Sequence, residues 1–317
     1  MIHLDAQEIT ELLPMRRAVD LMRDAFRLIS SGEAVSPVRL NLPIEKENAN
    51  SLLMPCYIPG GDYFGIKTAN VFPGNRSRGL PVINSQYHLY SAETGLLLAT
   101  MDGALLTKLR TGAASGLATE LLADKNASIL AVFGTGVQAE SQIEAVCCVR
   151  PIEEVLVFGR SPSASEEFAK RISGSVGQLV RGDVTLEDLR RADVICTATN
   201  STEALFQIGD VKPGAHINAI GAYRPEMCEI SAELIGGCRL IVDELEAALE
   251  EAGDIIQPLS SGLITEDHIA GELGDLVDVK VDVPRSSDEV TVFKSVGSAV
   301  QDFVCARDLF ERAGRKE

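Results

Sequence analysis

The chain has 317 residues, of which 45% are hydrophobic and 24% charged, so it is long enough for about two domains that each bury a core. Its net charge of −17 argues against nucleic acid as a partner, because phosphate contacts need a basic surface. No apolar run approaches the roughly 18 residues of a membrane span, and the first eight residues lack the basic start and apolar core of a signal peptide. The seven cysteines include no C-x-x-C pair, which indicates reduced thiols in a cytoplasmic protein and predicts no metal site.

The first third of the chain predicts one helix and then consecutive strands. The helix covers residues 15–29, where Met22 and Phe26 share an apolar face. Consecutive strands joined by short turns indicate an antiparallel sheet. A long helix over residues 103–123 comes next, with Asp102 as its cap. The strand-like stretches, separated by turn-rich segments, are residues 37–44, 51–57, 64–71, 82–90 and 96–101.

From residue 128 the pattern changes to alternating strands and helices. This rhythm is typical of a doubly wound parallel sheet, so the expected fold class is α/β, with a Rossmann sheet beside an antiparallel-sheet domain. A last helix over residues 296–313 follows the strand-like residues 289–293 and is expected to pack back on the first domain. The strands of the second pattern are predicted at residues 128–133, 155–158, 193–197, 215–220 and 239–242.

Residues 131–140 form a G-x-G-x-x-A motif in the order strand, turn, helix that a dinucleotide fingerprint requires. Gly134 permits the tight turn, Gly136 lets a pyrophosphate approach the backbone, and Ala139 keeps helix and strand close. Amides at the start of the helix then face the phosphates, whose charge the helix dipole favours. Ordinary glycine turns also match this motif, but the flanking pattern favours cofactor binding.

The end of the second strand of this pattern favours NADP(H), with NAD(H) also possible. NAD-preferring folds usually place an acidic residue there, on the ribose 2′-hydroxyl. Here the position holds Arg160, followed by Ser161 and Ser163, which together can hold a 2′-phosphate. The alternative is that Arg160 is a solvated loop residue.

Three basic residues lie within apolar segments. Arg39 and Lys67 belong to predicted strands, and Arg110 borders the apolar face of the predicted long helix. Taken singly, each is more often a solvated charge. Taken together with a nicotinamide site, they can converge on a substrate carboxylate, which arginine binds through two parallel hydrogen bonds.

Several segments in the same order along the chain resemble the ornithine cyclodeaminase/μ-crystallin family. The resemblance implies a homodimer, in which residues 1–122 and 295–317 form a substrate-binding and dimerisation domain. It also implies that residues 123–294 form an inserted NAD(P)-binding domain. The matching segments are the strand of Arg39 and residues 65–73, 101–111, 134–139, 271–275 and 287–297.

The resemblance also implies roles for individual residues. Arg39, Lys67 and Arg110 would bind the carboxylate of an amino or imino acid beside the nicotinamide, with Lys67 and Arg110 as catalytic residues. Met54 and Val296 would border the substrate. The residues implied for the dinucleotide are Arg110, Thr111, Gly134, Thr135, Gly136, Val137, Gln138, Arg160, Ser161, Thr197, Ala219, Ile220, Gly221 and Ser295.

One departure from the family pattern decides between its activities. Cyclodeaminases of this family carry an aspartate that handles the substrate amine, and Tyr223 takes its place here, with Glu226 as the only nearby substitute. The alternative for Tyr223 is a packed aromatic without a chemical role. Because a phenol titrates near about 10, it is a poor base at neutral pH.

The segment around Tyr223 looks more like the branch that reduces cyclic ketimines with NAD(P)H. We therefore expect reduction of Δ1-pyrroline-2-carboxylate or Δ1-piperideine-2-carboxylate to L-proline or L-pipecolate. The alternatives are an ornithine cyclodeaminase, an alanine dehydrogenase-like enzyme, a 3-hydroxyproline dehydratase and a non-catalytic crystallin-like binding protein.

Overall fold

The computed structural model describes residues 1–279 and 287–315. The chain forms two compact units: the mixed-sheet unit contains Met1–Arg110 and Ser298–Glu317, and the parallel-sheet unit contains Thr111–Gly297. The division falls inside helix α3 (Gly103–Leu122), whereas the sequence suggested a boundary after residue 122. The second half of α3 is bonded within the parallel-sheet unit, where Asn218 Nδ2 donates to Thr119 Oγ1 at 2.9 Å. In the described residues, no helix is both long and apolar enough to cross a membrane.

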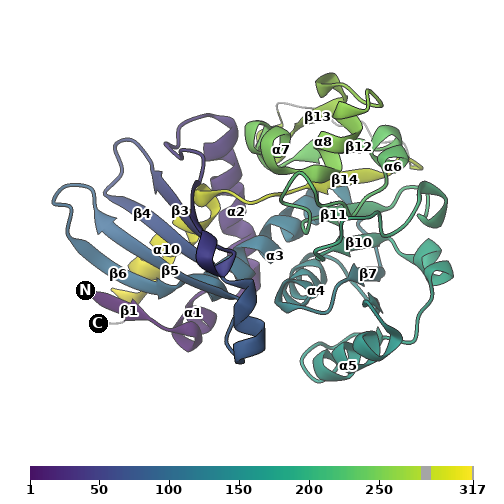
Figure 1. Ribbon diagram of the computed structural model, residues 1–317, viewed down its shortest axis with the longest axis horizontal. Coiled ribbons are helices and arrows are strands. Elements are labelled where there is room, and N and C mark those ends of the chain that lie inside the picture. Colours follow the sequence, from purple (N-terminus) through teal and green to yellow (C-terminus); the bar gives the residue numbers. More distant parts are fainter. Residues whose placement is uncertain (280–286, 316–317) are drawn as a thin grey trace. The chain divides into compact units, whose positions relative to one another are not determined.

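The mixed-sheet unit is a six-stranded sheet with helices packed on it (Figure 1). The strand order is β1-β6-β5-β4-β3-β2. Helix α10 (Ala299–Ala313) packs against β3, β4, β5 and α2, as the sequence predicted for the last helix. The remaining bounds are β1 (Ile2–Leu4), α1 (Ala6–Leu12), α2 (Met15–Ser30), β2 (Leu40–Ile44), β3 (Ala49–Tyr57), β4 (Tyr63–Val71), β5 (Ile83–Ser91) and β6 (Leu97–Asp102), with 3₁₀ turns at Glu45–Glu47 and Pro73–Arg78.

The expectation of a purely antiparallel sheet is wrong at one edge. Strand β1 pairs with β6 in parallel, because the chain passes through α1 and α2 before it returns to the sheet. Asp5 caps α1 by accepting from the amides of Gln7 and Glu8, while the Glu8 side chain accepts from the amide of Asp5. An Asp followed three residues later by Glu is a capping-box signal for a helix start. The spacing of Asp5 and Glu8 could therefore have predicted the short helix α1 from the sequence.

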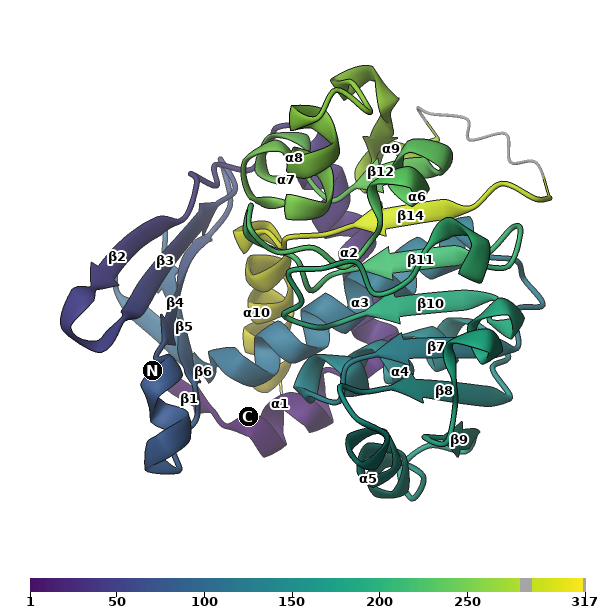
Figure 2. The ribbon, with the colours of Figure 1, turned by 45° about the vertical axis from the view of Figure 1, so that its right-hand side comes forward.

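The parallel-sheet unit has an eight-stranded sheet in the order β13-β12-β14-β11-β10-β7-β8-β9, and its pairings are parallel (Figure 2). The strands are β7 (Ile129–Phe133), β8 (Glu154–Phe158), β9 (Leu179–Arg181), β10 (Val194–Thr197), β11 (His216–Ala219), β12 (Arg239–Val242), β13 (Ile269–Glu272) and β14 (Thr291–Lys294). The helices are α4 (Val137–Val149), α5 (Pro162–Ile172), α6 (Ala232–Gly237), α7 (Leu245–Glu251), α8 (Gly253–Ser260) and α9 (Leu273–Val277), with 3₁₀ turns at Leu186–Arg191, Ile208–Asp210 and Glu266–His268.

Alternate residues of the central strands enter two separate cores, as a sheet covered on both faces requires. In β7, for example, Leu130 belongs to one core and Ala131 to the other. The doubly wound parallel sheet is therefore confirmed. Its strand order reverses between β7 and β10, the place where such sheets bind ligands at the carboxyl ends of their strands.

Candidate functional site

The mixed-sheet unit buries a cluster of cations under α10, defined by Arg39, Lys67 and Arg110. Lys67 lies in the middle of β4, and the strand register places it between Met54 on β3 and Tyr87 on β5. Lys67 is 2% exposed and Arg110 is 6% exposed, while Arg39 is half-buried. The expectation that Arg39 lies within a strand is wrong, because β2 begins at the next residue, Leu40. Met54, which the resemblance placed at the substrate, is thus a direct cross-strand neighbour of Lys67.

Asp302 of α10, which the sequence reasoning missed, holds two of these cations. Lys67 Nζ donates to Asp302 Oδ2 at 2.5 Å and to Thr107 Oγ1 at 3.3 Å. Arg110 Nε donates to Asp302 Oδ1 at 3.2 Å, and Arg110 Nη1 donates to Gln301 Oε1 at 2.8 Å. Because Lys67 and Arg110 share one carboxylate, these three groups together keep one positive charge.

The surroundings of Lys67 bring its pKa closer to neutral pH. Burial lowers the pKa of Lys67 to about 8, and the charges of Arg110 and Arg39 lower it too, while Asp302 raises it. Arg39 is therefore close enough to act on Lys67. A buried, positively charged cluster of this kind suits an anionic ligand.

Gly65 of β4 explains how the aromatic ring of Tyr87 fits beside Lys67. A Cβ at Gly65 would lie 1.9 Å from the Tyr87 hydroxyl, so only glycine leaves room for the ring. Within the described part of the chain the buried Tyr87 hydroxyl has no hydrogen-bond partner. Burial raises its pKa well above the ordinary value, so Tyr87 stays neutral beside the cations.

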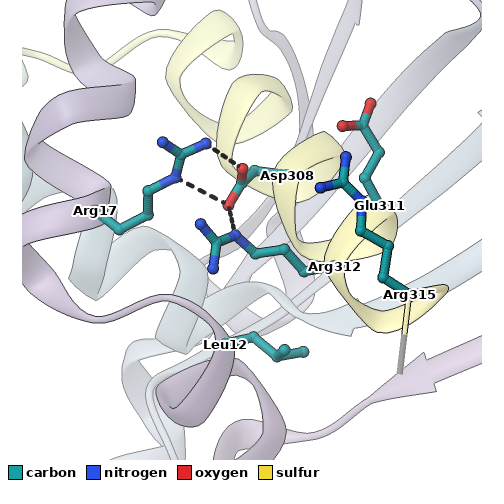
Figure 3. A pocket seen from close by; sticks show the side chains of 6 residues that line it. All are labelled: Leu12, Arg17, Asp308, Glu311, Arg312 and Arg315. Carbon is teal, nitrogen blue, oxygen red and sulfur yellow. Dashed lines mark hydrogen bonds and ion pairs between the residues drawn. The ribbon is translucent and has the colours of Figure 1, made fainter. Parts of the chain in front are cut away.

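A separate cavity of about 360 Å³ in the mixed-sheet unit also contains arginines, but it contains no member of the cation cluster. Figure 3 shows Asp308 between Arg17 and Arg312, which approach it to 2.6 and 2.8 Å. Glu311 adds a second carboxylate to the same wall. These arginines are paired within the protein, so the cavity is a poorer carboxylate site than the cation cluster.

In the parallel-sheet unit the glycine motif has the geometry of a phosphate-binding turn. Gly134 has a φ of 116°, and a Cβ there would lie 2.6 Å from the Ala198 carbonyl oxygen. Gly136 precedes α4 without a side-chain cap, and a Cβ there would meet nothing within 4 Å. Ala139 is fully buried against the core. The turn, the open approach at Gly136 and the uncapped helix start fit the pyrophosphate of a dinucleotide.

The residues beside this turn are less buried than Ala139. Thr135 and Gln138 are half-buried and Val137 is exposed. Gln138 Oε1 accepts from Ser141 Oγ at 3.1 Å, and the carbonyl of Thr111 accepts from Gln142 Nε2 at 3.5 Å.

The end of β8 places Arg160 and two serines together. Ser161 caps α5 by accepting from the Ala164 amide, and its hydroxyl lies 3.1 Å from that of Ser163. Arg160 is exposed, and its Nη2 donates to Asn200 Oδ1 at 3.2 Å. The Arg160 guanidinium therefore reaches the loop after β10, while the two serine hydroxyls lie at the start of α5.

Other residues that the resemblance placed at the dinucleotide direct their polar side chains into the protein. Thr197 Oγ1 donates to Glu229 Oε2 at 2.7 Å, and Ser295 Oγ donates to Asp243 Oδ2 at 2.7 Å. Ala219, Ile220 and Gly221 are buried at the end of β11, and Val296 belongs to a core of the parallel-sheet unit. The buried acids Glu229 and Asp243 were also missed, although acids set between apolar residues are a signal of such sites.

Tyr223 is not a packed aromatic in this chain. It is 39% exposed, and the guanidinium of Arg224 lies 5.5 Å from its ring centre. Glu226 is exposed and approaches Arg224 to 3.9 Å. Both side chains are therefore exposed to solvent and not enclosed in the protein.

Comparison with known proteins places these features in one family. The family model for the ornithine cyclodeaminase/mu-crystallin family matches residues 1–317. A Delta(1)-pyrroline-2-carboxylate reductase of Bacillus cereus is 36% identical over 316 residues, covering 99% of this chain and 97% of the relative. The ketimine reductase mu-crystallin of Mus musculus is 36% identical over 280 residues, covering 88% of this chain and 86% of the relative.

Two solved structures have the same fold along the whole chain. The Delta(1)-pyrroline-2-carboxylate reductase of Thermococcus litoralis, in complex with NADH and L-proline, has a TM-score of 0.94 at 34% identity, covering 100% of this chain and 98% of that one. An archaeal alanine dehydrogenase dimer with bound NAD has a TM-score of 0.92 at 34% identity, covering 100% of this chain and 97% of that one. The chain belongs to the ornithine cyclodeaminase/mu-crystallin family.

Proposed function

We propose that this protein reduces a cyclic imino acid, Δ1-pyrroline-2-carboxylate or Δ1-piperideine-2-carboxylate, to L-proline or L-pipecolate with a reduced nicotinamide cofactor. The observation that carries the proposal is the buried cation cluster, in which Lys67 and Arg110 share the carboxylate of Asp302. The similarity to Δ1-pyrroline-2-carboxylate reductases over 99% of the chain supports it.

Arg110 is the first anchor for the substrate carboxylate. Asp302 and Gln301 hold its guanidinium through Nε and Nη1, which fixes the plane of the group. Arg39 adds positive charge to the same region, as its effect on Lys67 indicates. Anchoring a small, rigid imino acid by its carboxylate fixes the orientation of its C=N bond, which accounts for a large share of such catalysis. Met54 would then border the ring.

Lys67 supplies the proton. When the C=N bond is reduced, the carbon accepts a hydride and the nitrogen accepts a proton, so the donor must hold a proton at the working pH, and for a lysine this is the charged form. With a pKa of about 8, Lys67 is charged at neutral pH and is more acidic than an exposed lysine. After the transfer the neutral lysine regains its proton from water.

The parallel-sheet unit would hold the cofactor, whose reduced nicotinamide supplies the hydride when bound. Its pyrophosphate would lie on the turn of Gly134 and Gly136, with Thr135, Val137 and Gln138 beside it. We propose that NADP(H) is preferred over NAD(H), because Arg160 and Ser161 stand where a carboxylate would bind a ribose hydroxyl. Thr111, Ala219, Ile220 and Ser295 would contribute mainly through their backbone, and Val296 would lie near the substrate.

We further propose a homodimer in the cytoplasm. Leu40 and Leu42 of the edge strand β2, with Val38 just before it, expose a row of apolar side chains, and such a row marks a surface that another chain covers. The related archaeal alanine dehydrogenase is a dimer. All seven cysteines are free thiols, as is usual for a protein in a reducing compartment. Fractionation of the source cells tests the location.

A substrate screen tests the proposal. The purified protein is incubated with NADPH or NADH and either Δ1-pyrroline-2-carboxylate or Δ1-piperideine-2-carboxylate, and cofactor oxidation and the amino acid product are measured. We expect turnover of at least one ring size. An alanine dehydrogenase is the second candidate because of the 34% identity to that structure, so pyruvate with ammonia is included. Turnover of pyruvate alone, without turnover of either imine, would contradict the proposal.

A further inference from the structure

Glu229 is a buried carboxylate that accepts four hydrogen bonds from two neighbouring strand ends. Its Oε1 accepts from the backbone amide of Thr199 at 2.6 Å and from the hydroxyl of Thr199 at 2.7 Å. Its Oε2 accepts from the hydroxyl of Thr197 and the backbone amide of Gly221, each at 2.7 Å. Glu229 is fully buried, so these donors take the place of water around the charge.

These donors lie at the carboxyl ends of two neighbouring strands. Thr197 ends β10, and Gly221 lies two residues beyond the end of β11. In a doubly wound sheet the second mononucleotide binds at the carboxyl ends of the strands beyond the reversal, which here are β10 and β11. A Cβ at Gly221 would lie 2.4 Å from Glu229 Oε1, so the glycine leaves the space that the carboxylate occupies.

A second layer keeps Glu229 in place. Asp254 Oδ1 accepts from the amides of Glu229 and Ile230 at 2.7 and 3.0 Å. Asp254 Oδ2 accepts from Lys294 Nζ at 2.8 Å, and both of these side chains are fully buried. Lys294 is the last residue of β14, so the layer also connects the carboxyl end of that strand.

We propose that Glu229 is a positioning residue for the cofactor: its carboxylate fixes the carboxyl ends of β10 and β11 so that they can hold the nicotinamide half. The inference rests on the proposed use of a nicotinamide dinucleotide. In this arrangement the hydroxyl of Thr197 donates to Glu229 and does not bind the cofactor. Since the adenosine half belongs to β7 and β8, its binding should not depend on Glu229.

The variant Glu229→Gln separates this role from simple space filling. Glutamine keeps the size of the side chain but replaces one acceptor oxygen with an amino group. In one orientation that group faces the amide of Thr199, and in the other it faces the amide of Gly221. A threonine hydroxyl can rotate, but a backbone amide cannot, so one buried amide loses its acceptor either way.

The experiment measures binding of NADPH, NADH and ADP to the whole protein without substrate, by titration calorimetry. ADP contains only the adenosine half. For Glu229→Gln we expect the Kd of NADPH or NADH to rise about tenfold or more, because a strand end that has lost its acceptor leaves the position in which it holds the nicotinamide half, while the Kd of ADP stays within about twofold. The control is Glu203→Gln, at an exposed acid in the loop after β10, and this variant should bind all three ligands as the wild type does.

A second variant covers the case in which Glu229→Gln does not fold. Thr197→Val with Thr199→Val removes two hydroxyl donors and keeps both amides. Removing these two donors raises the pKa of Glu229. Burial and the charge of Asp254 already raise this pKa, while the charge of Lys294 lowers it. Burial also raises the pKa of the nearby Cys228 to about 11, so this thiol stays neutral. Binding of NADPH to this variant should weaken as the pH falls, and more so than in the wild type.

Three outcomes would overturn the inference. Equal loss of ADP and NADPH binding in Glu229→Gln would mean that the residue supports the fold as a whole. Unchanged binding of both ligands would mean that it has no role at the cofactor, while the proposed function would stand. Absence of dinucleotide binding by the wild type would reject both this inference and the proposed function.

Discussion

At Lys67 the proposed chemistry depends on a single proton. The pKa of Lys67 is lowered to about 8, because burial and the charges of Arg110 and Arg39 together outweigh Asp302, which raises it. Tyr87 beside it is neutral. The charged form is the donor and is lost as the pH rises through this pKa. We therefore expect kcat/KM to be level below about pH 8 and to fall about tenfold per pH unit above it. A pH–rate profile measures this.

Two variants assign that pH dependence to Lys67. Asp302→Asn removes the carboxylate that raises the pKa, so the fall should begin at a lower pH than in the wild type. Lys67→Arg keeps the positive charge but does not titrate in this range. The same fall at the same pH in Lys67→Arg would assign it to the substrate or to another group.

Arg110→Ala should reduce catalysis without a matching loss of folding. Losing a bidentate contact to a buried carboxylate should lower kcat/KM on the order of a hundredfold. The matched control is Arg150→Ala, which removes a buried arginine that directly follows α4 and bonds to the end of α3. Arg150 donates to the carbonyl oxygens of Thr119, Glu120 and Ala123 at the end of α3. That variant should lower the melting temperature and leave KM unchanged, and normal kinetics of Arg110→Ala would remove Arg110 from the site.

Arg160→Asp should move the cofactor preference from NADPH toward NADH. The new carboxylate repels a 2′-phosphate and can accept from a ribose hydroxyl, so both changes act in the same direction. The ratio of kcat/KM for the two cofactors is the measurement. Lys170→Asp, an exposed change at the end of α5, makes the same change in net charge and should leave the ratio as it is. If Arg160→Asp keeps its preference for NADPH, the discrimination lies elsewhere.

At the scale of elements, patterns within one segment were enough to find most strands and helices. Alternation placed Lys67 in a strand, and helical spacing placed α2 at Met15–Ser30. The partners of these residues could not be found in the same way. Asp302 lies 235 positions after Lys67, and the two meet only because α10 packs on β4. Glu229 likewise acts on strand ends whose proximity depends on the order of the sheet.

The segment after β11 carries the prediction that separates the activities of the family. Deamination of ornithine needs a group that accepts and returns a proton of the amine, and Tyr223 is a half-exposed phenol. Incubation with ornithine and catalytic NAD(P)⁺ should therefore yield neither proline nor ammonia, while the imine is reduced. Proline formation that is abolished in Glu226→Gln would show that this exposed acid replaces the missing aspartate, and the choice of branch would be wrong.

At the scale of the whole molecule, the sequence predicted the two kinds of sheet but not where the chain divides. Helix α3 reads as one continuous pattern, yet its first half carries Arg110 of the cation cluster and its second half bonds to Asn218 of β11. No periodicity within the helix distinguishes the two halves. The return of the last helix to the mixed-sheet unit was predictable because that helix follows a complete βαβ pattern and has an apolar face of its own.

The last prediction concerns association of two chains. Strand β2 is an edge strand whose Leu40 and Leu42 are 59% and 50% exposed, and an apolar edge of this kind favours contact with another copy. Leu40→Asp with Leu42→Asp should place two charges in that contact and convert the dimer into a monomer, as measured by light scattering after size-exclusion chromatography. Leu96→Asp, at the exposed turn between β5 and β6, is the control and should stay dimeric. A variant of β2 that keeps twice the monomer mass would show that the two copies meet through a different surface, and a monomeric wild type would reject the dimer itself.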